Sequence, residues 1–312
     1  MGRLDVRKNT VVLYQPRKNL PFRPIEDLDF PREVQIQTHT ACNARCIMCP
    51  YEDIFKKVGH GRMRRELFER LIDECAGHEV WDLKPFLMNE PLLDRRLPSL
   101  VRYARERLPN TIIGFSTNGQ LLEGPLAEEL VDSGLDEIWV NFNGNTRTTY
   151  ETIMRGLSFE RVRRNVLDFK QLVVQKRANV CIFISTVETQ LAVAEIEASR
   201  AFWRQYDIPV VKTPLNNRGG NLQTNGLQVL RSIKGHRVCD RPFYNMYIAY
   251  NGDAILCSSD CERLMVIGNV EVDGLQRVWN SDRQKWVRKW ILAREWGKLS
   301  LCRSCDYIAI YD

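Results

Sequence analysis

The chain of 312 residues lacks any long hydrophobic run. No apolar stretch approaches the ~20 residues that a membrane-spanning helix requires, and residues 1–24 contain no continuous hydrophobic segment of the kind that marks a signal peptide. Internal repeats and low-complexity segments are also missing. These absences predict a cytoplasmic protein with no membrane partner. Because thiols stay reduced in that compartment, the ten cysteines favour metal or cluster binding over disulfides.

Strong clustering of one charge is missing as well. The net charge is +6 and the pI is about 8.8, but basic residues are mixed with acidic ones, and the basic runs at 62–65 and 161–164 are short. Such runs are more typical of solvated helix faces than of nucleic-acid surfaces, so we expect no nucleic-acid partner. A content of 44% hydrophobic and 27% charged residues is typical of a globular protein.

Strand-like and helix-like segments alternate through the first two thirds of the chain. The six strand-like runs are residues 33–38, 80–89, 111–117, 136–142, 179–187 and 208–213, and the five helix-like segments are 63–76, 97–108, 124–134, 159–176 and 193–206. Alternation of this kind predicts βα units and a parallel sheet. Six units are too few for a closed eight-stranded barrel. The expected fold is therefore α/β, a partial and open (βα)6 TIM-like barrel over residues 33–215, preceded by an N-terminal extension over residues 1–32.

The pattern changes from about residue 216. Residues 216–226 are rich in glycine and asparagine and predict a loop. Residues 243–260 predict a β-hairpin with a type I′ turn at Asn251-Gly252, and residues 275–296 predict one helix. A small C-terminal α+β domain, a β-hairpin plus a helix, is therefore expected over residues 216–312.

Three cysteines follow the first predicted strand, at the end of the barrel where βα proteins keep their chemistry. Cys42, Cys46 and Cys49 have the spacing C-x3-C-x2-C. A structural zinc site usually has four closed ligands, often from paired C-x2-C motifs, whereas this local set stops at three. A zinc loop that borrows His39 or His60 as its fourth ligand is the alternative.

The C-x3-C-x2-C motif after a first barrel strand resembles the radical S-adenosylmethionine (radical SAM) superfamily. The resemblance implies that the three thiolates hold three irons of a [4Fe–4S] cluster, and that SAM occupies the fourth iron. Cysteine thiolates are the general ligands of such clusters. The resemblance also implies a 5′-deoxyadenosyl radical that abstracts hydrogen from the substrate, and a flavodoxin- or ferredoxin-type reductant. The protein then has to position the cofactor.

Polar motifs at later strand ends resemble the SAM contacts of the same superfamily. Residues 88–91 stand where relatives have a Gly-Gly-Glu-type motif, and the Glu90 carboxylate suits the SAM ammonium group. The implied cofactor-binding residues are Met48, Asn89, Glu90, Ser116, Asn118, Asn141, Asn143 and Arg155. Each motif alone is equally typical of a polar loop that caps a helix, but their order at successive strand ends favours a cofactor site.

Four further cysteines lie in the C-terminal third: Cys239, Cys257, Cys302 and Cys305. Four thiolates can form a closed tetrahedral set, and spacing alone does not separate structural zinc from an iron–sulfur cluster. The region resembles the shortened SPASM, or twitch, domain of radical SAM enzymes, which implies one auxiliary [4Fe–4S] cluster. No cysteine follows Cys305, so a full SPASM domain with more clusters is not expected.

Cys75 and Cys181 are interpreted as core residues. Cys261 is interpreted as a buried or surface thiol, with a spare ligand as the alternative. The C-terminal pattern, including Asn217–Gly220, resembles radical SAM dehydrogenases of natural-product and antibiotic biosynthesis that oxidise a secondary alcohol. The resemblance implies a small polyhydroxylated substrate, such as an aminocyclitol, amino sugar or sugar nucleoside, and an auxiliary cluster that accepts an electron. It also implies that Arg218 is a catalytic residue that binds the hydroxyl oxygen; a loop arginine in a surface ion pair is the alternative.

Three other functions are compatible with the sequence. The same scaffold could catalyse a redox-neutral dehydration, decarboxylation or epimerisation of a sugar or nucleoside. It could also modify a ribosomal peptide, although the 32 residues before the first strand are too few for a peptide-binding winged-helix domain. A zinc-binding interaction protein without enzymatic activity is the third alternative.

Overall fold

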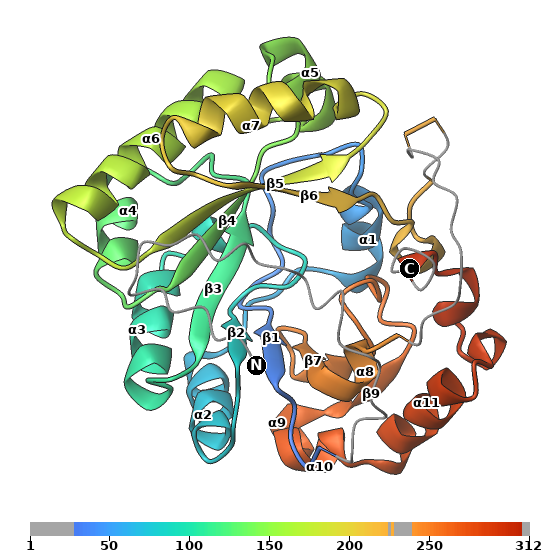
Figure 1. Cartoon of the computed structure of the whole chain (residues 1–312). Helices are drawn as coiled ribbons and strands as arrows, with labels where there is room; N and C mark the ends of the chain where they lie inside the picture. Colours follow the sequence, from blue (N-terminus) through green and yellow to red (C-terminus); the bar gives the residue numbers. More distant parts are fainter. Residues whose placement is uncertain (1–27, 224–225, 228–238, 308–312) are drawn as a thin grey trace.

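The structure is a computed structural model that describes residues 28–223, 226–227 and 239–307. Most of the expected N-terminal extension therefore lies outside the described residues. A nine-stranded sheet forms the centre of the molecule, and its first six strands lie side by side in chain order, all parallel (Figure 1). These strands are β1 (Glu33–Ile36), β2 (Asp82–Lys84), β3 (Ile112–Thr117), β4 (Glu137–Asn141), β5 (Cys181–Glu188) and β6 (Val210–Pro214). The α/β prediction of a partial parallel barrel is confirmed.

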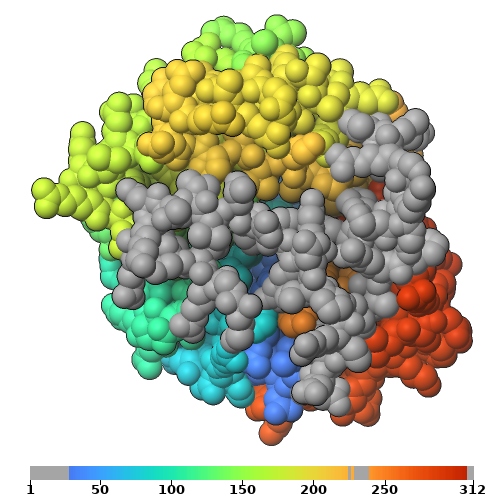
Figure 2. Space-filling model, viewed as in Figure 1, coloured from blue at the N-terminus to red at the C-terminus, as the bar shows by residue number. Residues whose placement is uncertain are grey.

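Five of the helices that cover this sheet match the predicted segments. They are α2 (Arg65–Ala76), α3 (Leu97–Arg107), α4 (Gly124–Val131), α6 (Phe159–Gln175) and α7 (Ile196–Arg204), and Figures 1 and 2 show α6 and α7 as one outer wall of the molecule. In α6, Ser158 accepts a hydrogen bond from the Arg161 backbone N–H and so caps the helix. Val162, Val166 and Phe169 recur at helical spacing on its buried face.

Two short helices that the sequence patterns did not predict lie in the loops after β1 and β4. They are α1 (Tyr51–Val58) and α5 (Arg147–Ile153). A cluster of buried aromatic rings packs α5 against its neighbours: Phe142 lies 4.7 Å from Tyr150 and 5.3 Å from Trp203, measured between ring centroids. Burial of each such side chain contributes about 1.5–3 kcal/mol, which fixes the loop that follows β4.

The predicted hairpin is confirmed, and it extends the barrel sheet. β7 (Asn245–Ile248) pairs in parallel with β1, and β8 (Asp253–Ile255) and β9 (Val266–Asn269) follow as antiparallel strands. The C-terminal third therefore shares one continuous sheet with the barrel. The predicted type I′ turn is wrong, because Gly252 has φ +85° whereas Asn251 has no positive φ, and that turn requires both.

The prediction of one helix over residues 275–296 is also wrong. The segment forms α10 (Leu275–Trp279), α11 (Asp282–Leu292) and a 3₁₀ turn at Trp296–Lys298. The break comes at Ser281, whose extended backbone and side-chain hydrogen bond to the Gln284 N–H start a new helix. The other short helices of this region are α8 (Arg241–Tyr244), α9 (Val270–Asp273) and the 3₁₀ turns η3 (Arg218–Gly220) and η5 (Cys302–Ser304).

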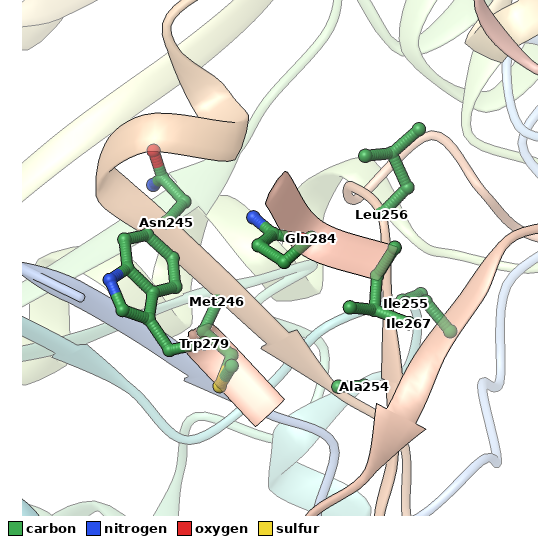
Figure 3. Close-up of a pocket in the computed structure, with 8 residues that line it drawn as sticks. All are labelled: Asn245, Met246, Ala254, Ile255, Leu256, Ile267, Trp279 and Gln284. Carbon is green, nitrogen blue, oxygen red and sulfur yellow. The ribbon is translucent and has the colours of Figure 1, made fainter. Parts of the chain in front are cut away.

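A small cavity lies between the extended sheet and helices α10 and α11. Figure 3 shows the mostly apolar side chains that line it, including Met246, Ile267 and Trp279. Its volume of about 10 Å³ leaves room for about one water molecule at most. It is a packing gap of the core and not a substrate site. No helix within the described residues is long and apolar enough to cross a membrane.

Candidate functional site

The first cysteine loop (residues 42–49) is held in place by the end of α5. The backbone N–H groups of Arg45 and Ile47 donate to the carbonyl oxygens of Arg155 and Ile153, at 2.8 and 3.0 Å. A Cβ atom on Gly156, which has φ +87°, would lie 3.3 Å from the Asn43 carbonyl oxygen. The Arg155-Gly156 pair therefore supports the cysteine loop through its backbone, while the Arg155 side chain is exposed.

Tyr51 also holds this loop, and no pattern in the sequence pointed to it. Its hydroxyl donates to the Thr40 carbonyl oxygen at 2.9 Å and accepts from the Cys42 N–H at 2.8 Å. The only available signal was its position two residues after Cys49. The start of the loop is thus tied to the start of α1.

Glu90 is buried in the loop after β2, next to the end of β3. Its Oε1 accepts from the Thr117 hydroxyl at 2.6 Å and from the Leu92 N–H at 3.1 Å, and its Oε2 accepts from the Asn118 N–H at 2.7 Å. Burial raises the pKa of Glu90 to about 7, although these hydrogen bonds oppose the rise. The carboxylate is therefore fixed in orientation between the ends of β2 and β3.

His39 supports the same residue from β1. Its Nδ1 accepts from the Ala41 N–H at 3.0 Å, which leaves Nε2 to donate to the Glu90 carbonyl oxygen at 2.9 Å. Burial lowers the pKa of His39 and keeps the ring neutral. With both nitrogens engaged, His39 does not fit the role of a fourth zinc ligand.

Two asparagines lie beside Glu90, and one of them contacts the first cysteine loop. The Asn118 side chain donates to Asn43 Oδ1 at 2.7 Å and so links the end of β3 to that loop. Asn89 Oδ1 accepts from the Leu87 N–H, but Asn89 Nδ2 is buried and has no hydrogen-bond partner. A buried donor without an acceptor is costly, so this group fits a ligand that brings an acceptor, such as the carboxylate of SAM.

The other residues predicted to contact the cofactor differ in how buried their side chains are and in whether the protein already uses their hydrogen-bonding groups. Met48 is buried, and Ser116 and Asn141 are half-buried at the ends of β3 and β4. Asn143 is fully buried, and its amide is already used by the protein: Nδ2 lies 3.1 Å from Met154 Sδ, and Oδ1 accepts from the Val187 N–H at 2.6 Å. Asn143 therefore stabilises the loop after β4 through contacts inside the protein.

The thiols of the first loop lie close enough to repel one another when ionised. Burial raises the pKa of Cys42 to about 12 and raises the pKa of Cys46 as well, and the charge of Cys49 adds to both effects. Such thiols lose their protons when a metal binds, because the cation stabilises the thiolate. The donor set therefore fits a bound metal cluster.

The structure also brings the second cysteine set together, namely Cys239, Cys257, Cys302 and Cys305. Burial raises the pKa of Cys302, and the other three thiols raise it further. Backbone N–H groups point at the sulfurs: Ser259 N lies 3.4 Å from Cys257 Sγ, and Tyr307 N lies 3.4 Å from Cys305 Sγ. Hydrogen bonds of this kind are typical around iron–sulfur clusters.

Over residues 28–223, 226–227 and 239–307, no three His, Cys, Asp or Glu side chains are arranged to hold a single metal ion. The thiolates of a four-iron cluster each bind a different iron, so they stand farther apart than the ligands of one ion. Two separated sets of thiols are thus compatible with two clusters.

The Cys261 thiol lies near Arg218 and near a thiol of each cysteine set. Burial raises the pKa of Cys261 to about 12, the charge of Arg218 lowers it, and Cys49 and Cys257 raise it. The charges of one thiol from each set and of the predicted catalytic arginine therefore all act on one buried thiol. Of the two possibilities for Cys261, a buried or a surface thiol, the structure shows the buried one, with an exposed fraction of 3%.

The loop that carries Arg218 is anchored to the segment that carries Cys302 and Cys305. Asn217 N donates to Asp306 Oδ1 at 2.8 Å, and Asn217 Nδ2 donates to the Ser304 carbonyl oxygen at 2.6 Å. A Cβ atom on Gly219 would lie 2.5 Å from a methyl carbon of Leu301. The close packing of η3 on η5 therefore explains the two adjacent glycines after Arg218.

Comparison with protein families agrees with this geometry. Residues 36–190 match the model of the radical SAM superfamily, and residues 239–306 match SPASM, an iron–sulfur cluster-binding domain. The chain belongs to the radical SAM superfamily. A radical SAM domain and a SPASM domain together imply SAM, a SAM-binding [4Fe–4S] cluster and an auxiliary [4Fe–4S] cluster.

Two similar proteins match this radical SAM protein over most of its length. The S-adenosyl-L-methionine-dependent 2-deoxy-scyllo-inosamine dehydrogenase of Niallia circulans is 22% identical, over 89% of this chain and 93% of the relative. The tungsten-containing aldehyde ferredoxin oxidoreductase cofactor-modifying protein of Pyrococcus furiosus is 23% identical, over 89% of each chain. The first is named a dehydrogenase and the second a cofactor-modifying protein.

Solved structures share the fold. BtrN in complex with AdoMet and 2-DOIA has a TM-score of 0.63 and 20% identity, over 90% of this chain and 95% of BtrN. Streptococcus suis SuiB bound to precursor peptide SuiA has a TM-score of 0.68 and 16% identity, over 91% of this chain and 71% of SuiB. At such identities these likenesses support the radical SAM fold and no more.

Proposed function

We propose that this radical SAM protein is an oxidoreductase that oxidises a secondary alcohol of a small polyhydroxylated molecule to a ketone. The substrate class would be an aminocyclitol, an amino sugar or a sugar nucleoside. The observation that carries the proposal is that the charges of Arg218, Cys49 and Cys257 all act on the buried Cys261 thiol, so that Cys261 lies near a thiol of each cysteine set. A substrate between the two sets would be within reach of both centres. The named activity of the Niallia circulans relative supports the direction of the reaction.

In this proposal each cysteine set has one role. Cys42, Cys46 and Cys49 hold the cluster that binds SAM, and the second cysteine set holds the auxiliary cluster. When bound, SAM and its cluster supply a radical that removes a hydrogen atom from the substrate carbon, and the auxiliary cluster accepts the second electron. A flavodoxin- or ferredoxin-type protein supplies the reducing electron for SAM cleavage.

The chain's own residues position these groups. Glu90, held by three hydrogen bonds, offers a carboxylate to the SAM ammonium group, and Asn89 Nδ2 offers a donor to its carboxylate. The Arg218 guanidinium would bind the substrate hydroxyl oxygen and stabilise the negative charge that develops when its proton leaves. Arg218 has φ +51°, and the Asn216 side chain accepts its N–H at 3.1 Å, so its backbone is held in one conformation.

The decisive experiment uses anaerobically reconstituted protein with SAM and a reductant. A panel of aminocyclitols, amino sugars and sugar nucleosides is offered, and 5′-deoxyadenosine and product mass are followed together. A product lighter by two hydrogens, formed with one 5′-deoxyadenosine, is the expected result. Loss of water or carbon dioxide, or a product of unchanged mass, would replace the oxidation with a redox-neutral reaction. If no small molecule reacts, peptides become the substrate class to test.

Arg218→Ala tests the catalytic arginine. We expect product formation to fall at least tenfold while 5′-deoxyadenosine is still made, because SAM cleavage does not depend on Arg218. Arg177→Ala is the matched control: Arg177 also has a positive φ (52°), but it lies in the loop between α6 and β5. Equal turnover in the two variants would remove Arg218 from the mechanism.

A further inference from the structure

Arg241 joins the three segments that carry the second cysteine set. It lies two residues after Cys239, and its backbone N–H hydrogen-bonds to that thiol. Its guanidinium donates a hydrogen bond through Nη1 to the Ser259 hydroxyl at 3.3 Å. The same group lies over the ring of Tyr307, with Cζ 3.5 Å from the ring centroid.

These contacts follow one rule along the chain. Ser259 and Tyr307 each stand two residues after a cysteine, and each donates its backbone N–H to the sulfur of that cysteine at 3.4 Å. Arg241 therefore contacts the two residues whose N–H groups bind the sulfurs of Cys257 and Cys305. One side chain connects every N–H donor at an i+2 position of this cysteine set.

The charge of Arg241 is directed at the thiols. It acts electrostatically on Cys239, Cys257 and Cys305. No carboxylate of the described residues forms an ion pair with this guanidinium. The nearby acid Asp306 accepts from the Asn217 N–H, and Asp260 accepts from the backbone N–H groups of residues 264 and 265. Among the described residues, the guanidinium therefore contacts a hydroxyl and an aromatic ring, while the charges of Asp240 and Asp306 also act on thiols of this set.

We propose that Arg241 is a positioning residue that raises the reduction potential of the auxiliary cluster and so makes it an effective electron acceptor. A cluster with four thiolate ligands gains negative charge when it takes up an electron, and a nearby cation stabilises the reduced form. The inference rests on the proposed function in one respect, the assignment of the second cysteine set to that cluster. In the proposed reaction, the substrate radical loses one electron and its hydroxyl proton to become the ketone, and the auxiliary cluster gains that electron.

The test uses the full chain with Cys42, Cys46 and Cys49 replaced by alanine, so that only the auxiliary cluster remains. Iron and sulfide content and an EPR-monitored redox titration are measured in this background and with Arg241→Gln or Arg241→Lys added. Arg107→Gln is the matched control, because Arg107 also lies over a tyrosine ring, that of Tyr103, but far along the chain from the second cysteine set.

We expect Arg241→Gln to weaken electron uptake at least tenfold, which is a fall of about 59 mV in a one-electron potential. Arg241→Lys keeps the positive charge and should weaken electron uptake less than tenfold, and Arg107→Gln should leave the potential unchanged. An unchanged potential in a fully loaded Arg241→Gln protein would overturn the inference. If Arg241→Gln does not bind the cluster, Arg241→Lys decides the question. A potential that falls by about 59 mV or more in the lysine variant, which keeps the positive charge, would overturn the role of charge.

The proposed function fails separately from this inference. If the protein without its first three cysteines binds no four-iron cluster, the assignment of the second set is wrong, and the inference falls with it. If it binds a cluster whose potential ignores Arg241, only the inference falls.

Discussion

Replacement of Gly219 by alanine tests the contact between the loop that carries Arg218 and the segment that carries Cys302 and Cys305. Gly219 has φ +68°, and a Cβ atom there would lie 2.5 Å from one carbon of Leu301 and 3.1 Å from another. Leu301 is 1% exposed, so its side chain has little room to move away. The substitution should therefore push η3 away from η5, which carries Cys302.

Two terms set the size of the effect. An L-residue in the left-handed region costs about 1–2 kcal/mol, and an extra carbon forced into a packed contact costs about 1–3 kcal/mol. Gly219→Ala should therefore lower the free energy of unfolding by about 2–5 kcal/mol. Gly226 offers a matched control, because it has φ +73° but a Cβ atom added there would meet no other atom within 4 Å. Gly226→Ala should show only the backbone cost.

The assay is urea unfolding of the reduced, metal-free protein, followed by circular dichroism. The difference between the two variants isolates the contact with Leu301 and should be about 1–3 kcal/mol. After reconstitution, Gly219→Ala should also hold less iron than Gly226→Ala, because η5 is displaced. Equal unfolding free energies for the two variants would refute the packing of this loop on the C-terminal cysteine segment.

Three further predictions concern elements that support the strand ends. Asp94 is buried, which raises its pKa, but hydrogen bonds and charges from Arg96 and Arg62 outweigh burial and lower the pKa below its usual value. Its ionised form therefore stabilises the fold above pH ~4, the unfolded-state pKa, and loses this effect as the pH falls through the lower folded-state pKa. Asp94→Asn should therefore cost more stability at pH 7 than at pH 3 in urea unfolding, and an equal cost at both pH values would contradict this. Glu195 accepts hydrogen bonds from the Asn145 and Thr146 N–H groups and from two threonine hydroxyls at the start of α5. Glu195→Ala should destabilise the protein by about 1–3 kcal/mol in the same assay, and a loss no larger than that of the exposed Glu197→Ala would argue against the cap. Ser281→Ala should cost about 1 kcal/mol by removing the cap of α11, and an unchanged unfolding midpoint would show that the cap is dispensable.

The alternation of apolar strands and amphipathic helices predicted the six parallel strands because each pattern has a distinct period. Lengths were less predictable. The second predicted strand, residues 80–89, is reduced to β2 (Asp82–Lys84), since Pro85 cannot donate a ladder hydrogen bond. The pairing of β7 with β1 could not be predicted either, because it joins segments more than 200 residues apart in the chain.

The candidate site shows the same division. The cysteine spacings alone pointed to two metal-binding sites, and only the resemblance to radical SAM enzymes predicted iron–sulfur clusters there. The roles of the polar residues depend on tertiary contacts that no local pattern encodes. Asn143 is engaged by Met154 and Val187, and Tyr51 holds the first cysteine loop although no motif marked it.

The pairing of β1 with β7 makes the separation of the two cysteine sets a property of the backbone. β1 leads into the first cysteine loop, and the β7–β8 hairpin leads to Cys257, while Gln35 is paired with Tyr247. A shift of one residue in this register would turn every side chain of β7 to the opposite face of the sheet, so the register is strongly specified. The strands that lead into the first cysteine loop and toward Cys257 are therefore aligned with each other as soon as this part of the sheet forms.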